Sequence, residues 1–108
     1  MITKVYRGET WLARDEESGK KRPFLIVSEA LSGIDIDVTV LPITTKEKRN
    51  SFDIEAELWK EAGFNKPSLI RCSKVHFISH RFLIHKLGHL DEQDLVHVND
   101  AMREYLGL

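Results

Sequence analysis

The sequence has little of what would tie a small protein together covalently or hold it in a membrane. Its 108 residues include one cysteine, Cys72, which excludes an intrachain disulfide and is typical of a reducing compartment. No apolar run approaches the roughly 20 residues of a membrane-spanning helix, and the amino end has no signal-peptide core. We therefore expect a cytoplasmic protein with no membrane partner.

A charge of one sign is also missing. The chain has 16 Lys and Arg against 17 Asp and Glu, a formal net charge of −1, which excludes a uniformly basic nucleic-acid-binding surface. The sequence also has no repeats, low-complexity tracts or linkers. With 42% hydrophobic residues, residues 1–108 are expected to form a single domain with one modest core.

Short apolar segments separated by turn residues predict a mainly β domain. Residues 34–40 alternate between aliphatic and polar side chains, which is the pattern of a half-buried strand. Pro42 has no backbone N–H and is expected to place the end of that strand at a sheet edge or in a bulge. Further strands are expected at residues 9–14, 24–28, 51–56 and 68–73.

Two helices are expected. The clearer one follows Asp91, a residue that can cap a helix, and it carries a regular apolar stripe before Gly107. We expect this stripe to pack on the sheet rather than to bind a partner. A second, brief helix is expected over residues 57–64, stopped by Gly63 and Pro67. These elements predict an α+β domain, a mainly antiparallel sheet that is either open or curled into a small barrel, with helices at one side.

The histidines and the cysteine do not predict a metal or nucleophile site. The β-branched residues and Gly88 around the histidines favour strand and turn over one continuous helix, and no cysteine pair accompanies them. We therefore expect structural histidines and no bound metal. Cys72, within an apolar strand, is more often a core residue than a nucleophile. The histidines considered are His76, His80, His85 and His89.

Two basic loops are the most informative polar feature. If strands 24–28 and 36–41 are neighbours, both loops lie at the same end of the pair, and that end would attract phosphates. Solvated loops with solubilising charge are an equally good interpretation of the charges alone. Thr44 and Thr45 add hydroxyl donors there. The basic residues are Lys20, Lys21 and Arg22 in the first loop and Lys46, Lys48 and Arg49 in the second.

Five segments, in order over nearly the whole chain, resemble the MazF/PemK toxins of bacterial toxin–antitoxin modules. They are RGETWLA, KKRPFLIVSEA, VLPITTK, GFNKPSLIRCSKVHFIS and HKLGHLDEQDLVHVNDAMREYLGL. The resemblance implies an SH3-like small antiparallel barrel with a carboxyl-terminal helix. It also implies a homodimer, neutralised by a cognate antitoxin, that cleaves single-stranded RNA without a metal or other cofactor.

The resemblance also implies roles for individual residues. Arg22, the arginine of the RP pair, and Thr44, the threonine after PI, are expected to be catalytic, and Glu17 matches an acidic loop position and is expected to act as the base. Residues expected to bind RNA are Lys20, Lys21, Thr45, Lys46, Lys48, Arg71 and Ser73.

The sequence departs from the family pattern near these residues. Ser18 stands where a glutamine usually follows the loop acid, and Ser73 stands in the position of an aspartate that serves as base in PemK-like members. Lys74 and His76 replace residues of the usual DQxR run, so no RNA sequence preference is transferred. Two alternatives stay open: a gyrase poison that does not cleave nucleic acid, and a catalytically weakened module that binds RNA or antitoxin.

Overall fold

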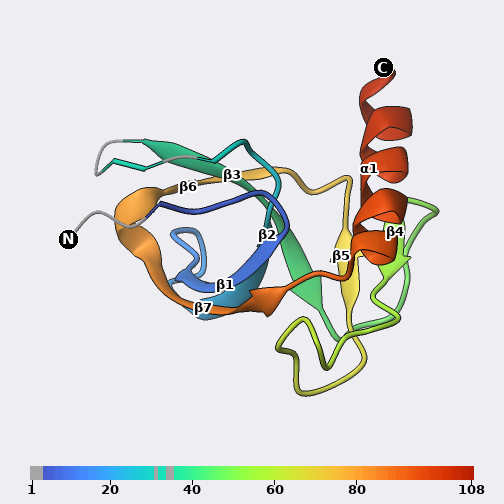
Figure 1. Ribbon diagram of the computed structural model, residues 1–108, viewed down its shortest axis with the longest axis horizontal. Helices are drawn as coiled ribbons and strands as arrows, with labels where there is room; N and C mark the ends of the chain where they lie inside the picture. Colours follow the sequence, from blue (N-terminus) through green and yellow to red (C-terminus); the bar gives the residue numbers. More distant parts are fainter. Residues whose placement is uncertain (1–3, 31, 34–35) are drawn as a thin grey trace.

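Seven strands and a carboxyl-terminal helix make up the part of the chain that the computed structural model describes, residues 4–30, 32–33 and 36–108 (Figure 1). The elements are β1 (Glu9–Arg14), β2 (Lys21–Ile26), β3 (Asp37–Thr44), β4 (Asp53–Glu55), β5 (Leu69–Arg71), β6 (His76–Ser79), the 3₁₀ turn η1 (His80–Phe82), β7 (Leu83–His89) and α1 (Glu92–Leu106).

The strands form one antiparallel sheet in the order β4-β5-β3-β2-β1-β7, and β6 pairs with β3 beside this path. In Figure 1, α1 stands next to β4 and β5 at one side of the molecule, while β1 and β7 lie at the other side. The predicted antiparallel sheet with a carboxyl-terminal helix is confirmed. Over the described residues the sheet stays open, because no pairing joins β4 to β7.

Strand β3 has two partners on the side that faces away from β2. Asp37–Val40 pair with β6, whereas Ile43 and Thr44 pair with β5. Pro42 lies between these two stretches, so its missing N–H falls where the partner changes and no ladder bond is lost. The prediction that Pro42 places this end of the strand at a sheet edge or in a bulge is therefore wrong, since β3 continues to Thr44 and its last two residues pair with β5. Residues 34–35 of the predicted strand lie outside the described residues.

Alternation along the strands divides the core into two clusters. Leu25, Leu41 and Ile43 pack in one cluster with residues of α1, including Val98. Their neighbours along the chain point to the opposite side of the sheet. The second cluster contains residues of four strands, namely Trp11, Ala13, Phe24, Ile26, Val38, Val40 and Ile78, together with Val5.

The helix predicted after Asp91 is confirmed, and it packs on the sheet. The Asp91 carboxylate accepts a hydrogen bond from the backbone N–H of Gln93 at 3.0 Å, which satisfies one of the free donors of the first turn. At the other end Gly107 adopts φ 75°, a left-handed conformation in which glycine is favoured and the helix stops. Val98 and Ala101 are buried against the sheet.

The helix predicted over residues 57–64 is wrong, because this segment forms a series of turns. Both carboxylate oxygens of the buried Asp94 on α1 accept hydrogen bonds from the backbone, one from Glu57 at 3.2 Å and one from Leu58 at 3.1 Å. At the other end Gly63 adopts φ 90° against the carbonyl of Leu87, where an added Cβ would lie only 2.3 Å away. Contacts at both ends therefore fix a path that helix propensity does not favour.

Candidate active site

The two basic loops meet at one end of the sheet, as the sequence predicts. Phe24 pairs with Pro42, and continuing this antiparallel register by two residues brings Arg22 opposite Thr44. Both residues are on the face of the sheet that carries Phe24 and Val40. The register therefore puts a guanidinium and a hydroxyl at corresponding positions of two neighbouring strands, just beyond their last recorded pair.

The Arg22 side chain is about half exposed, at 48%, and is oriented by the preceding loop. Its Nε lies 3.6 Å from Asp15 Oδ2 and 3.5 Å from Ser18 Oγ. These contacts use one of the five N–H donors of the guanidinium and are too exposed to neutralise it strongly. Pro23 restricts the backbone of Arg22 to extended conformations, which further limits where the side chain can reach.

The loop between β1 and β2 is built around Asp15. The Asp15 backbone N–H donates to the Lys20 carbonyl at 2.8 Å, and its carbonyl accepts from Gly19 at 2.7 Å. Its carboxylate accepts from the Glu17 backbone at 3.2 Å and from Ser18 Oγ at 3.0 Å. This network holds the loop closed above the start of β2 and fixes the backbone of Glu17.

Glu17 is exposed and lines a pocket of about 340 Å³ between this loop and the beginning of β6. The Arg22 guanidinium pairs with Asp15 rather than with Glu17. The family resemblance singled out Glu17, and the run Asp15, Glu16 and Glu17 gives no indication that Asp15 is the acid whose carboxylate turns toward the arginine. The pocket is lined by Asp15, Glu16, Glu17, Val75, His76, Phe77 and Ile78.

Thr44 is half-buried at the end of β3, and its Oγ1 accepts a hydrogen bond from the Lys46 backbone at 3.1 Å. The hydroxyl hydrogen is not used in that bond and can donate to an anionic oxygen. The arrangement at this end of the sheet therefore combines a cation, a hydroxyl donor and nearby carboxylates. Such a set can stabilise negative charge and move a proton.

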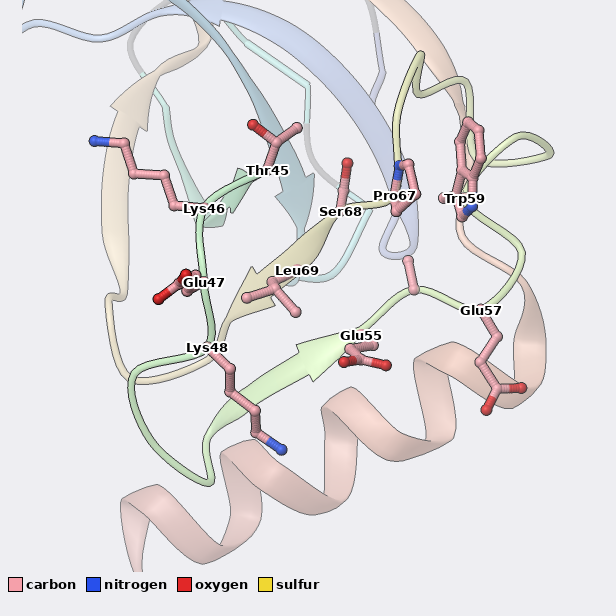
Figure 2. A pocket seen from close by; sticks show the side chains of 11 residues that line it. Thr45, Lys46, Glu47, Lys48, Glu55, Glu57, Trp59, Pro67, Ser68 and Leu69 are labelled. Atoms are coloured by element: carbon pink, nitrogen blue, oxygen red, sulfur yellow. The ribbon is translucent and has the colours of Figure 1, made fainter.

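The second basic loop borders a pocket of about 430 Å³ whose charge is mixed (Figure 2). Figure 2 shows Lys46 extending away from the pocket and Lys48 extending toward β4 and α1. Acidic side chains also line it, so the lysines do not make a uniformly positive surface. The lining residues are Thr45, Lys46, Glu47, Lys48, Glu55, Ala56, Glu57, Trp59, Pro67, Ser68 and Leu69.

Arg71 at the end of β5 is held by contacts to Asp53 and to the loop between β3 and β4. Arg71 is 6% exposed, forms a buried ion pair with Asp53, and donates to the Glu47 carbonyl at 3.2 Å. Asp53 also accepts from the Arg49 backbone at 2.7 Å. Arg71 therefore fastens the loop between β3 and β4 to β5. Ser73 is half-buried in the turn that follows β5.

Cys72 is a core residue, as the sequence predicts. It is fully buried, and burial together with the negative charge of Asp53 raises the pKa of its thiol to about 12. The thiolate that nucleophilic chemistry needs is therefore scarce near neutral pH.

Metal sites and membrane-spanning helices are the two other features considered for the described residues. Within residues 4–30, 32–33 and 36–108, no group of three or more His, Cys, Asp or Glu side chains is arranged to hold a metal ion. In the same part of the chain, no helix combines the length and the apolar character needed to span a membrane.

Known proteins resemble this chain over nearly all of its length. A family model described as "PemK-like, MazF-like toxin of type II toxin-antitoxin system" matches residues 6–106. A protein of Mycolicibacterium smegmatis named "Probable endoribonuclease MazF" is 31% identical over 100 residues, covering 92% of each chain.

Solved structures show the same fold. The Mycobacterium tuberculosis toxin MazF-mt6 superimposes with a TM-score of 0.77 at 24% identity, covering 93% of this chain and 97% of that one. A MazE-MazF crystal structure from Deinococcus radiodurans gives a TM-score of 0.76 at 19% identity, with 98% of both chains covered.

We predict that Arg71→Ala mainly destabilises the fold. The substitution leaves the Asp53 carboxylate buried without its cation, which typically costs about 3–5 kcal/mol. Urea unfolding of the variant and the wild type measures the loss. Arg103→Ala is the matched control, because Arg103 and Asp100 lie 3.9 Å apart and are both 67% exposed, and such a pair contributes about 0–1 kcal/mol. A loss for Arg71→Ala no larger than that of the control would contradict the assignment.

Proposed function

This chain belongs to the PemK-like, MazF-like toxin family, and on that premise we propose that it is the endoribonuclease toxin of a type II toxin–antitoxin module. Its substrate is single-stranded RNA, chiefly mRNA, cut at specific sequences. The observation that supports the proposal is the register of β2 and β3, which puts Arg22 and Thr44 at corresponding positions at one end of the pair, next to a loop of carboxylates.

The proposed reaction is an attack by the ribose 2′-hydroxyl on the adjacent phosphorus. Glu17 removes the hydroxyl proton, the O2′–P bond forms, and the P–O5′ bond breaks. The products are a 2′,3′-cyclic phosphate and a 5′-hydroxyl. Negative charge builds on the non-bridging oxygens, where the Arg22 guanidinium can donate two hydrogen bonds and Thr44 a third.

In this proposal the protein supplies the positive charge itself, and cleavage needs no metal ion. The exposed lysines at the same end of the sheet add phosphate contacts that fix RNA in register without reading its sequence. The polar residues proposed to contact RNA are Lys20, Lys21, Thr45, Lys46, Lys48 and Ser73. For Arg71, also expected to bind RNA from the sequence, the buried pairing with Asp53 favours an indirect role through the loop that it holds.

We predict that the purified protein cleaves single-stranded RNA in the presence of a chelator, because the charge stabilisation comes from Arg22 rather than from a bound cation. Gel analysis of a labelled RNA, with the fragment ends identified by their susceptibility to phosphatase and kinase, gives both the activity and the products. Activity that disappears in chelator and returns with Mg²⁺ would contradict this. If no RNA is cut, the gyrase-poison and weakened-module hypotheses are favoured instead.

Variants in the same assay connect the activity to this site. Arg22→Ala and Thr44→Ala each remove a donor to the transition state, a loss that typically slows turnover about 10²–10³-fold. Arg81→Ala is the matched control, since Arg81 is exposed on η1 and contacts Ser79 and the Phe82 ring. Near-normal turnover by Arg22→Ala would show that the wrong arginine has been named.

We predict that Glu17→Gln slows cleavage far more than Ser73→Ala. A carboxylate can accept a proton near neutral pH, whereas a serine hydroxyl is too weak a base without another group to activate it. Loss of a general base typically costs about 10²–10⁴-fold in rate. Single-turnover rates of the two variants decide the matter, and a larger loss for Ser73→Ala would reverse the assignment.

We further predict a homodimer whose RNA groove crosses the interface and is blocked by a cognate antitoxin. The relative from Deinococcus radiodurans is described as a MazE-MazF complex. Large apolar side chains are exposed on β6 and β7 of this chain, including Phe77 at 67% and Ile84 at 41%, and a second copy could cover such residues. Sedimentation velocity at micromolar concentration tests this, and a fully active monomer would count against it.

A further inference from the structure

A histidine at the start of β6 lines the same pocket as Glu17. His76 is half-buried, and it reaches this pocket of about 340 Å³ from the opposite side to the β1–β2 loop. Its sequence context predicts a structural histidine. In the structure it both lines the pocket of the loop carboxylates and contacts the buried ring of Phe24.

One ring contact and one shared pocket connect His76 to the end of the sheet that carries Arg22. Its ring meets Phe24 edge to face, with the ring centroids 6.2 Å apart, and Phe24 is the residue that follows Arg22 on the same face of β2. Asp15 provides the second connection, because it lines the pocket with His76 and pairs with Arg22 at 3.6 Å. His76 therefore shares a pocket with the acid that pairs with Arg22 and contacts the neighbouring aromatic ring of the same strand face.

One nitrogen of the His76 ring is fixed and the other is available for proton transfer. His76 Nδ1 lies 2.8 Å from the Lys74 carbonyl oxygen. A carbonyl can only accept, so Nδ1 carries a hydrogen in both charge states of the ring. Nε2 is then the nitrogen that gains and loses a proton.

Charged groups of both signs surround the pocket. The β1–β2 loop presents Asp15, Glu16 and Glu17 to His76. Arg22 on β2 opposes them, but it is paired with Asp15, and Lys74 contributes its exposed ammonium group from the segment before β6. Opposite His76, β3 presents the uncharged Val40. An imidazolium carries the hydrogen on Nε2 that an acid needs.

Building on the ribonuclease function proposed above, we propose that His76 is the general acid of the cleavage reaction. Glu17 takes the proton of the 2′-hydroxyl as the O2′–P bond forms. His76 Nε2 gives its proton to O5′ as the P–O5′ bond breaks, leaving a neutral imidazole and a 5′-hydroxyl. Exchange with water returns both side chains to their starting states. The residue that His76 replaces in the DQxR run is an arginine, which cannot exchange a proton near neutral pH.

The test compares His76→Asn with wild type on two RNAs that differ at the mapped cleavage site, one with the natural bridging O5′ and one with sulfur in its place. The asparagine amide can still donate to the Lys74 carbonyl but lacks Nε2. On the oxygen substrate we expect a loss of about 10²–10⁴-fold. On the sulfur substrate we expect a rate within a few-fold of wild type, because a thiolate leaves without receiving a proton.

The pH dependence and a matched set of variants identify the role. An acid must be protonated to act, so the wild-type rate on the oxygen substrate should fall with rising pH within the range of about pH 5–8 in which imidazoles change charge. His76→Asn should lack that fall. Glu17→Gln should be slow on both substrates, and His85→Asn, at an exposed position on β7, should match wild type on both.

The thermal unfolding temperatures of His76→Asn and of a second variant, His76→Gln, are measured first. The cleavage rates are then compared with wild type for the variant that unfolds at the wild-type temperature. A variant within a few-fold of wild type on the oxygen substrate would overturn the assignment. A variant equally slow on both substrates would overturn it too, because its defect would not be in protonating the leaving group. Failure of the wild type to cut any RNA would instead refute the proposed ribonuclease function.

Discussion

The antiparallel register between β2 and β3 is the constraint on which the rest of the molecule depends. Phe24 opposite Pro42 and Ile26 opposite Val40 assign the even-numbered residues of both strands to one face and the odd-numbered residues to the face that α1 covers. A slip of one residue would turn every side chain of a strand to the other face. It would separate Arg22 from Thr44 in the same step, so the core packing also positions the candidate site.

Two arginines show how environment decides what one residue type can do here. Arg71 is 6% exposed and its charge is paired with Asp53, so it contributes by holding the loop between β3 and β4 in place. Arg22 is 48% exposed on its side chain, and its contact with Asp15 is long, so it keeps donors for a ligand. A net charge of −1 is compatible with the proposed phosphate-binding end, because attraction of an anion depends on the local arrangement of charges rather than on their sum.

Much of the fold could be predicted because local patterns and tertiary contacts agree. The alternation along β3 and the capped helix after Asp91 are of this kind. The helix predicted at residues 57–64 failed because Asp94, distant in sequence, binds the backbone of that segment. The same limit applies to the site. Arg22 and Thr44 are candidates that the family resemblance supplies, but the position of His76 beside Phe24 depends on how β6 pairs with β3, which no local pattern encodes.

The divided pairing of β3 explains how these parts come together around one end of the sheet. β6 pairs with β3 as far as Val40, and β5 pairs with β3 from Ile43 onward. Since Pro42 has no N–H to satisfy, neither strand needs to cover it, and the two partners can diverge there. β5 carries Arg71, whose ion pair with Asp53 anchors the second basic loop. β6 carries His76, which lies across a pocket from the first basic loop. The proline that was expected at a sheet edge or in a bulge instead lies inside β3, where the strand passes from one partner to the other.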